Sequence, residues 1–522
     1  MAKQLSECLQ QYHLPKFENE WGNIRRGIEK ESLRVSPNGN ISSSPHPIAL
    51  GSALTNPYIT TDFSEALLEL ITPVSDTIHE CLQVLENIHR FTVQNIDDKE
   101  MLWVTSMPCP LEDDAKIPIA QYGSSNIGKL KTLYRHGLHN RYGSLMQAIA
   151  GIHYNFSMPE AFWEGYKNIC NFDGSIQKFR TEKYLHLIRN FHRYSWLLIY
   201  LFGASPAACK CFTAGREHDL EELDEFTLYK PDATCLRMSN LGYKSEAQKS
   251  LFVCYNDLET YVDCLHEAIH TPYEKYSSIG QYSDGEYRQI NTNLLQLENE
   301  FYSTIRPKRN AKPGEKPLEA LTNSGIEYIE VRALDLDPYS PLGINEEQIR
   351  FLDSFLLHCL LADSPDCNEN EFFEVGNNVN KVVEHGRNSK LMLDKQSTPK
   401  NIKEWSHELI EDISYSAGLL DSVHQTNNYY SSLITQEKKI DNPSLTPSGR
   451  MLSEMQEENL SFYEFSIKQS RTHHQTLSNA KLDQITFSHM QKMSNDSLAK
   501  QKMIEDSDTT SFEEFLNQWN ET

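Results

Sequence analysis

Acidic residues recur at strand spacing near the start of this chain. In residues 27–35, GIEKESLRV, a strand would put Glu29, Glu31, Leu33 and Val35 on one face, because side chains alternate along a strand. Two neighbouring carboxylates on one face repel each other unless cations or solvent separate them. A solvated strand face is the simpler interpretation of this segment alone, and a cation site is the alternative.

A further carboxylate lies inside an apolar run. Glu69 is the only polar residue of segment 67–71, LLELI. A charged group in such surroundings is rarely buried without a partner, because its desolvation is costly. Glu69 therefore indicates a sheet edge, a cation or a metal. Upstream, Asp62 and Glu65 match a helix capping box; we assign Glu65 that structural role and leave Asp62 open.

Residues 151–157, GIHYNFS, split into two faces when read as a strand. His153, Asn155 and Ser157 form a polar face opposite an apolar, largely aromatic one. Such a strand suits a sheet that lines a wet cavity. A lone histidine is more often structural than a metal ligand, but beside the carboxylate segments both roles remain open for His153.

Residues 325–334, GIEYIEVRAL, carry the last of these patterns. Alternation gives a core face and an opposite face that presents Glu330 and Arg332 together. The two side chains could form a simple ion pair. They also suit a site where one group holds a cation and its neighbour holds an anionic substrate.

Taken together, several carboxylates and one histidine on strand faces predict an oxygen-rich site for hard divalent cations. Mg²⁺, with Mn²⁺ as an alternative, fits better than Zn²⁺, because no thiolate or multi-histidine cluster is present. Cation sites of this kind commonly serve phosphoryl transfer, in which the cations neutralise nucleotide phosphates.

The charge of the chain excludes two classes of partner. It has 49 Lys and Arg against 73 Asp and Glu, a formal net charge of −24. Such a surface repels nucleic acid and anionic membranes. A nucleotide substrate would therefore need cations or a few arginines supplied by the site itself.

Nothing in the sequence suggests export. The first residues lack the basic stretch and apolar run of a signal peptide, and the longest apolar run, residues 196–202, is too short to span a bilayer. The eleven cysteines have scattered spacing that does not suggest a disulfide framework or a zinc site. We expect a cytoplasmic protein.

The chain divides by composition at about residue 360. Residues 1–360 mix strand-like and helix-like segments and carry the chemistry, whereas residues 361–522 have mostly helical periodicity. Within the first region, residues 306–317 are rich in Pro, Gly and Lys, which predicts an exposed loop. Near the end, residues 510–514, TSFEE, match a capping box before an apolar helical stripe. We predict a mainly helical C-terminal region packed on a catalytic domain.

The same segments, in this order, closely resemble the glutamate–cysteine ligases of the proteobacterial, single-activity type. The resemblance covers residues from about 22 to about 360, and more weakly the rest of the chain. The matching stretches are RGIEKESLR (26–34), ITTDF (59–63), EALLE (65–69), KTLYR (131–135), GIHYNF (151–156), YLFGASP (200–206), RMS (237–239), IRPKR (305–309) and GIEYIEVR (325–332).

The resemblance implies a fold and a reaction. The fold is α+β and glutamine-synthetase-like, an antiparallel sheet bent into a funnel and surrounded by helices. In the reaction, ATP phosphorylates the γ-carboxylate of glutamate, and the amine of cysteine attacks this acyl phosphate to give γ-glutamylcysteine, the first step of glutathione biosynthesis. The resemblance also suggests a monomer.

The resemblance further assigns roles to individual residues. The implied metal ligands are Glu29, Glu31, Asp62, Glu69, His153 and Glu330. Arg332, together with Glu330, is implied to be catalytic, holding the transferring phosphoryl group or the glutamate. The implied substrate-binding residues are Gln147, Asn155, Tyr134, Arg237, Tyr243 and Tyr302, the last four forming the cysteine pocket. Arg306, Lys308 and Arg309 are weaker candidates for nucleotide contact, because a basic loop is usually just solvated.

The resemblance leaves some alternatives open. Family members can carry a disulfide, and Cys109 and Cys170 lie near the corresponding places, although a cytoplasmic compartment disfavours the bond. The alternatives to this function are a ligase of the same fold that uses another amine, a non-catalytic sensor that keeps the scaffold, and a divalent-metal hydrolase in which the same acids activate water.

Overall fold

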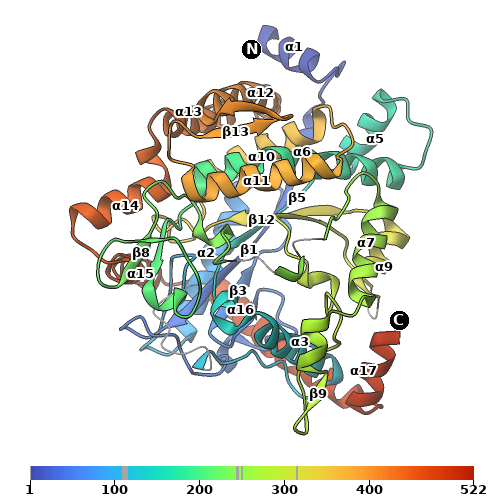
Figure 1. Cartoon of the computed structure of the whole chain (residues 1–522). Helices are drawn as coiled ribbons and strands as arrows, with labels where there is room; N and C mark the ends of the chain where they lie inside the picture. Colours follow the sequence, from blue (N-terminus) through green and yellow to red (C-terminus); the bar gives the residue numbers. More distant parts are fainter. Residues whose placement is uncertain (1, 109–115, 243–245, 249–250, 313–314, 522) are drawn as a thin grey trace.

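A mixed arrangement of one large sheet and many helices is seen in the structure, a computed structural model that describes residues 2–108, 116–242, 246–248, 251–312 and 315–521 (Figure 1). The large sheet has seven strands among these residues, in the order β11-β12-β5-β1-β3-β2, with β4 paired to β1. Every pair in it is antiparallel. The strands are β1 (Arg25–Val35), β2 (Ile59–Thr61), β3 (Leu67–Ile71), β4 (Met101–Leu102), β5 (Ile152–Ser157), β11 (Ile305–Lys308) and β12 (Tyr328–Leu334).

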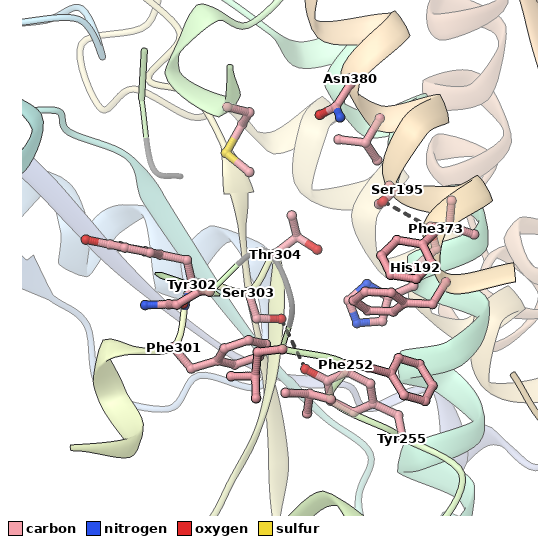
Figure 2. Close-up of a pocket in the computed structure, with 18 of the residues that line it drawn as sticks. His192, Ser195, Phe252, Tyr255, Phe301, Tyr302, Ser303, Thr304, Phe373 and Asn380 are labelled. Carbon is pink, nitrogen blue, oxygen red and sulfur yellow. Dashed lines mark hydrogen bonds between the residues drawn. The ribbon is translucent and has the colours of Figure 1, made fainter. Parts of the chain in front are cut away.

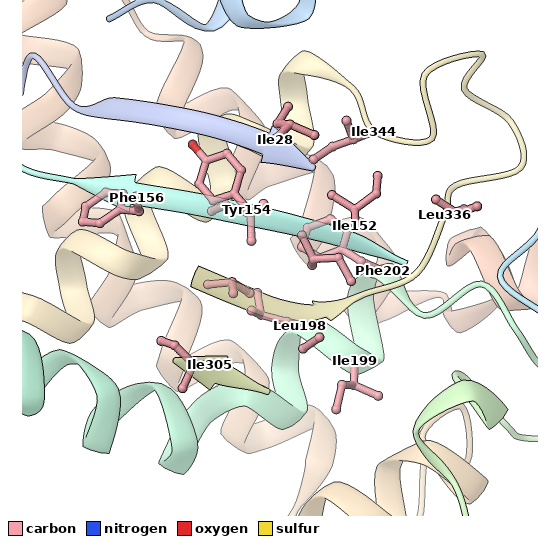
Figure 3. Packing of buried hydrophobic residues seen from close by; sticks show 14 of the residues in the cluster. Ile28, Ile152, Tyr154, Phe156, Leu198, Ile199, Phe202, Ile305, Leu336 and Ile344 are labelled. Atoms are coloured by element: carbon pink, nitrogen blue, oxygen red, sulfur yellow. The ribbon is translucent and has the colours of Figure 1, made fainter. Parts of the chain in front are cut away.

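The apolar face of this sheet packs on helices. Figure 3 shows Ile28 of β1 and Tyr154 and Phe156 of β5 on one side, with Leu198 and Phe202 of α6 (Ile176–Phe202) in the same cluster. Helix α10 (Glu346–Leu361) packs on α6 and carries a further row of buried apolar side chains. Burying this face turns the alternate, polar side chains of the same strands towards the opposite side.

The remaining helices surround these layers. They are α1 (Ala2–Gln11), α2 (Ile78–Asn95), α3 (Asn126–Tyr142), α4 (Ser144–Gln147), α5 (Glu160–Ile169), α7 (Leu258–His270), α8 (Glu274–Ile279) and α9 (Pro317–Ser324). The described residues also form three small sheets: β6 (Ala207–Cys209), β7 (Glu221–Glu222) and β8 (Thr227–Tyr229); β9 (Tyr282–Ser283) and β10 (Glu286–Tyr287); β13 (Met392–Lys395) and β14 (Thr398–Asn401). No helix of the described residues is long and apolar enough to cross a membrane.

The C-terminal region is mainly helical, apart from the β13–β14 hairpin. Its helices are α11 (Glu369–His385), α12 (Ile402–His424), α13 (Asn428–Asp441), α14 (Pro447–Glu457), α15 (Phe462–Asn479), α16 (Gln484–Ser507) and α17 (Phe512–Glu521). One apolar cluster runs from Cys8 to Met490, so helices α11 to α16 share the core of the sheet, whereas α17 packs in a separate small cluster with α3. The capping box before α17 is confirmed: Ser511 Oγ accepts from the Glu514 backbone N–H, and the Glu514 carboxylate accepts from Ser511 N–H.

Two local predictions were wrong. Asp62 and Glu65 lie in the turn between β2 and β3, not at a helix start; the Glu65 carboxylate accepts from the backbone N–H groups of His46 and Gln121. The stretch predicted as an exposed loop from residue 306 begins instead with strand β11, and Arg306 is buried. Strand β11 lies at the sheet edge, where a proline such as the one at position 307 is tolerated because the missing N–H costs no ladder hydrogen bond.

Candidate active site

Three neighbouring strands bring together the centre of the site. Glu29 of β1 lies opposite His153 of β5, and Glu31 of β1 lies opposite Glu69 of β3. As a result, ligand atoms of Glu29, Glu69 and His153 all lie within 4.8 Å of one another. Two acids and an imidazole at this spacing can share one cation.

The other predicted metal ligands lie around this centre. Glu31 Oε1 is 3.9 Å from His153 Nε2, and Glu330 Oε1 is 3.9 Å from His153 Nδ1. The second oxygen of Glu31 accepts from the Gly151 backbone N–H at 2.7 Å. Asp62 lies close enough for its charge to raise the pKa of Glu31 and of Glu69, although it is not part of the three-residue centre.

Crowding of these acids shifts their protonation. Burial, followed by the charge of Asp62, raises the pKa of Glu31 to about 7. Burial and the charges of Glu29, Asp62 and Glu31 raise the pKa of Glu69 well above its ordinary value. For Glu330 burial acts in the same direction, but Lys308 and other cations outweigh it and hold its pKa well below the ordinary range. The cluster therefore contains more carboxyl groups than can all ionise unless a cation neutralises part of their negative charge.

The donor atoms fit a hard divalent cation. Glu29 Oε1 accepts from Asn155 Nδ2 at 2.8 Å, and Glu29 Oε2 lies 3.2 Å from His153 Nδ1. Asn155 Oδ1 is buried and has no hydrogen-bond partner among the described residues. An unsatisfied carbonyl oxygen beside several carboxylates is suited to Mg²⁺ or to one of the waters that Mg²⁺ retains.

Basic side chains border the acids on one side. Arg332 Nη1 donates to Glu330 Oε2 at 3.2 Å, and Lys308 Nζ is 3.4 Å from Glu330 Oε1. Both side chains stay partly exposed, at 27% for Arg332 and 31% for Lys308. They can therefore meet an anionic group brought in by a substrate.

The other two basic candidates are differently placed. Arg306 is buried and donates to the backbone carbonyls of Asn299 and Phe301, an arrangement that fixes the preceding loop. Arg309 donates to the carbonyl of Ser324 and lies 3.7 Å from Glu327. Of the three nucleotide-contact candidates, Lys308 is the one whose side chain is recorded in an ion pair with the acid cluster, although Arg306 lies opposite Glu330 in the sheet.

A cavity of about 450 Å³ opens beside the cluster, lined by His153, Arg332, Arg237 and Tyr302 among others (Figure 2). Gln147 donates its side-chain amide to the Tyr302 hydroxyl at 3.0 Å, which couples two of the predicted substrate-binding residues. The cavity thus joins a wall that carries Arg237 and Arg332 to the acid cluster at His153.

The structure describes the tyrosines of the predicted cysteine pocket only in part. Tyr134 is partly buried on α3, and Tyr302 is among the groups that, after burial, raise its pKa, so the two tyrosines are near neighbours. Tyr243 lies outside the described residues. Arg237 and Tyr302 line the cavity and Tyr134 neighbours Tyr302, while the cysteine pocket itself stays a prediction.

Comparison with known proteins decides the family. A family model of glutamate–cysteine ligases matches residues 9–382. Glutamate–cysteine ligases from Alcanivorax borkumensis and Saccharophagus degradans are 49% and 50% identical to this chain, over 94% and 95% of it and 95% and 94% of their own lengths. The chain belongs to the glutamate–cysteine ligase family.

Solved structures agree with this membership. The glutamate–cysteine ligase of Francisella tularensis, crystallised in complex with AMP, is 36% identical, with a TM-score of 0.90 over 96% of this chain and 98% of that one. A bifunctional glutathione synthetase from Pasteurella multocida, 24% identical with a TM-score of 0.69, shares the fold over 90% of this chain and 54% of that one. The resemblance to the ligase family and the α+β, glutamine-synthetase-like fold are both confirmed.

The sequence patterns missed Asp335, which lies beside the cavity-lining Arg237. This carboxylate is almost fully buried and accepts from Arg237 Nε at 2.7 Å, from Ala204 N–H at 2.8 Å and from the Ser205 hydroxyl at 2.6 Å. It directly follows β12 in the sequence, and an acid that ends a buried strand was the available signal.

The disulfide between Cys109 and Cys170, which the sequence left open, is untested. Cys170 carries a free, exposed thiol at the C-terminus of α5. The other cysteine considered for this bond, Cys109, lies outside the described residues.

Proposed function

We propose that this chain joins the γ-carboxylate of glutamate to the α-amine of cysteine with hydrolysis of ATP to ADP, the first step of glutathione biosynthesis. The observation that carries the proposal is the acid cluster of Glu29, Glu69 and His153, which borders the cavity lined by Arg237 and Arg332. Such a site provides charge neutralisation and positioning, which phosphoryl transfer requires more than a protein nucleophile.

The reaction follows from what each part of the site can bind. A γ-carboxylate oxygen of glutamate attacks the terminal phosphorus of ATP, and ADP leaves. The cysteine amine then attacks the acyl phosphate carbon, inorganic phosphate departs with the C–O electron pair, and the amine loses a proton. Mg²⁺ held by Glu29, Glu31, Asp62, Glu69, His153 and Glu330 would supply the positive charge that nucleotide phosphates require.

The residues of the chain divide the remaining tasks. Arg332, partly exposed beside Glu330, is suited to hold the phosphoryl oxygens or the glutamate. Arg237, fixed by Asp335, suits a substrate carboxylate on the cavity wall. Gln147 and Tyr302, hydrogen-bonded to each other, are suited to orient the acceptor amino acid. We further expect a monomeric, cytoplasmic enzyme.

The proposal is tested by measuring ADP release with ATP, Mg²⁺ and glutamate, with and without cysteine, and by detecting the product by mass. Cysteine-dependent ADP and the mass of γ-glutamylcysteine would support the ligase. Equal ADP release without an amine would indicate a hydrolase, and no release under any condition would indicate a sensor. Replacing cysteine by 2-aminobutyrate measures how far the thiol itself is recognised, because one small group changes binding only modestly.

A further inference from the structure

Of the proposed metal ligands, Asp62 alone lies outside the strands of the large sheet, in the turn that joins β2 to β3. After burial, the charge of Asp62 is the largest cause of the raised pKa of Glu31, so the Asp62 carboxylate lies close to the acid cluster. No regular ladder of strand hydrogen bonds holds a residue in a turn. The direction of this carboxylate therefore depends on contacts that come from outside the sheet.

The segment just before α3 runs along this turn and ends at Tyr122. Ile119 forms an antiparallel bridge with Ser64, and the Ala120 N–H donates to the Phe63 carbonyl at 3.1 Å. Tyr122 follows and is only 1% exposed. The segment thus brings a buried phenol to the start of the turn.

The Tyr122 hydroxyl binds the backbone of the turn directly. It donates to the Thr61 carbonyl at 2.7 Å and to the Asp62 carbonyl at 3.0 Å, so its single proton is shared between the two. Thr61 Oγ1 donates to the same hydroxyl at 3.1 Å, which directs the phenol proton towards the carbonyls. The guanidinium of Arg135 lies 4.5 Å from the centroid of the Tyr122 ring, and Arg135 Nε also donates to the Asp62 carbonyl. Two donors from one stacked pair therefore meet at a single carbonyl oxygen.

These bonds occupy the backbone of Asp62 completely. Its N–H donates to the Leu67 carbonyl at 3.0 Å, and the two donors use both lone pairs of its carbonyl oxygen. The carbonyl therefore has no lone pair left for a cation, and the carboxylate is the group that Asp62 can offer to one. With the backbone fixed, only the side-chain torsions remain to set the direction of that carboxylate.

We infer that Tyr122 is a positioning residue for the cation site, which holds the Asp62 carboxylate in place for Mg²⁺ without touching the ion. The inference rests on the proposed function, in which Asp62 is a Mg²⁺ ligand. Replacing a residue that orients a metal ligand typically lowers metal affinity about 10- to 100-fold. A hydroxyl that acts through the backbone belongs at the lower end of that range. In Tyr122→Phe the ring can still stack on Arg135, so the loss is confined to the hydroxyl.

The test measures the binding of Mn²⁺ alone, without nucleotide or amino acids, from the EPR signal of the free ion. Tyr122→Phe should raise the dissociation constant about tenfold. Thr61→Val, which keeps the side-chain shape but removes the donor to the phenol, should give a smaller rise. In the ligase assay, the Mg²⁺ concentration for half-maximal rate should rise with the dissociation constant. The kcat of Tyr122→Phe at saturating Mg²⁺ should stay close to that of wild type, because the ion can still fill the site.

Tyr184→Phe is the matched control. Tyr184 of α6 is equally buried, and its hydroxyl accepts from the Met158 N–H at 3.2 Å instead of binding the turn. Both tyrosine variants should lower the melting temperature, but Tyr184→Phe should keep the wild-type dissociation constant for Mn²⁺. An unchanged constant in Tyr122→Phe, or an equal rise in both variants, would overturn the inference and leave the proposed function intact. Failure of the wild-type protein to bind Mn²⁺ would overturn the cation site of the proposed function itself, and the inference with it.

Discussion

Arg237 and Asp335 form a buried ion pair beside the substrate cavity, with Arg237 Nε 2.7 Å from Asp335 Oδ1. Arg237 also donates through Nη2 to the carbonyl of Arg332 at 3.2 Å. Asp335 is held in turn by the N–H of Ala204 and the hydroxyl of Ser205. The carboxylate therefore fixes the direction of a guanidinium that lines the cavity, and links it to the strand that carries Arg332.

Asp335→Asn should impair both stability and catalysis. Removing one charge of a buried pair costs about 3–5 kcal/mol of folding free energy, and misplacing a substrate-holding group by about 1 Å can cost roughly 10²-fold in rate. We expect a lower melting temperature and a raised KM for an amino-acid substrate, with a smaller change for ATP. Steady-state kinetics and thermal melts measure both.

Asp353→Asn is the matched control for that variant. Asp353 pairs with Arg26 at 2.9 Å, is equally buried and also accepts from Tyr154 on the apolar side of the sheet. It should lower the melting temperature without changing the pattern of KM values. If both variants changed KM alike, the loss at Asp335 would reflect general destabilisation.

Glu330→Gln should nearly abolish turnover while the fold stays intact. Glu330 lies 3.9 Å from His153 and pairs with Arg332 and Lys308. Its negative charge therefore belongs to the acid cluster and also holds these two basic side chains. A loss of at least about 10²-fold in kcat is expected from removing one such electrostatic group. Glu327→Gln, three residues earlier, partly exposed and paired with Arg309 instead of the cluster, should leave kcat unchanged. Wild-type turnover in the Glu330 variant would remove this residue from the site.

The faces of the strands could be predicted from the sequence, because a period of two assigns every side chain to one side. Glu29 with Glu31, His153 with Asn155, and Glu330 with Arg332 indeed lie on the polar face of one sheet. What the sequence could not provide is the pairing: Glu31 faces Glu69 only because β1 and β3 meet in one register, and that register is set by long-range packing.

Local patterns misled where tertiary structure dominates. Asp62 and Glu65 have the spacing of a capping box, but Glu65 finds stronger partners in the N–H groups of two distant loops. Arg306 and Lys308 looked like part of a solvated loop, since alternating basic residues and proline carry no strand signal of their own. These residues can form a strand at the edge of the sheet, because one side of β11 has no neighbouring strand to which its backbone must hydrogen-bond.

Glu69→Gln should stabilise the metal-free protein and reduce its response to Mg²⁺. The pKa of Glu69 is raised by burial and by neighbouring acids, so the folded state opposes its ionisation, and stability falls as pH rises above the ordinary carboxyl pKa. An amide removes this penalty at neutral pH. The free energy of unfolding of the wild-type protein should increase by about 2.7 kcal/mol when Mg²⁺ reaches 100 times its dissociation constant. That of the variant should increase less.

Thermal melts with EDTA and with Mg²⁺ measure this prediction without any substrate. Glu65→Gln is the control, because Glu65 lies four residues earlier and binds backbone N–H groups instead of the cluster. It should lower the melting temperature and keep the full Mg²⁺ response. An undiminished response in the Glu69 variant would show that Mg²⁺ binds elsewhere.

His358→Met should make the protein less sensitive to acid. Burial lowers the pKa of His358 to about 4, from an ordinary value of about 6.5. Between these values the unfolded chain binds a proton that the folded state excludes, so stability is lost as pH falls through this window, by up to about 1.4 kcal/mol per pH unit. Methionine removes the proton uptake. Urea unfolding at several pH values across this window should show that the free energy of unfolding of His358→Met depends less steeply on pH. The exposed-site variant His266→Met should keep the wild-type pH dependence.

Leu516→Ala should weaken acceptor binding from a distance. Leu516 of α17 is buried against Leu130 and Leu133 of α3, in a small cluster that also includes Tyr134. Truncating a buried leucine costs about 2–5 kcal/mol, which is enough to loosen α17. Because α3 carries Tyr134, and its Arg135 donates to the carbonyl of Asp62, we expect KM for cysteine to rise more than KM for ATP.

Hydrogen exchange provides the second readout for this variant. Loosening should appear first in α17 and α3, because α17 packs on α3 and Asn126 at the start of α3 donates to the carbonyl of Thr510. Leu516→Met, which keeps most of the apolar volume, should restore both exchange protection and KM. If Leu516→Ala loosened α17 and left KM for cysteine unchanged, Tyr134 would hold its position without the C-terminal helix, and α17 would serve stability alone.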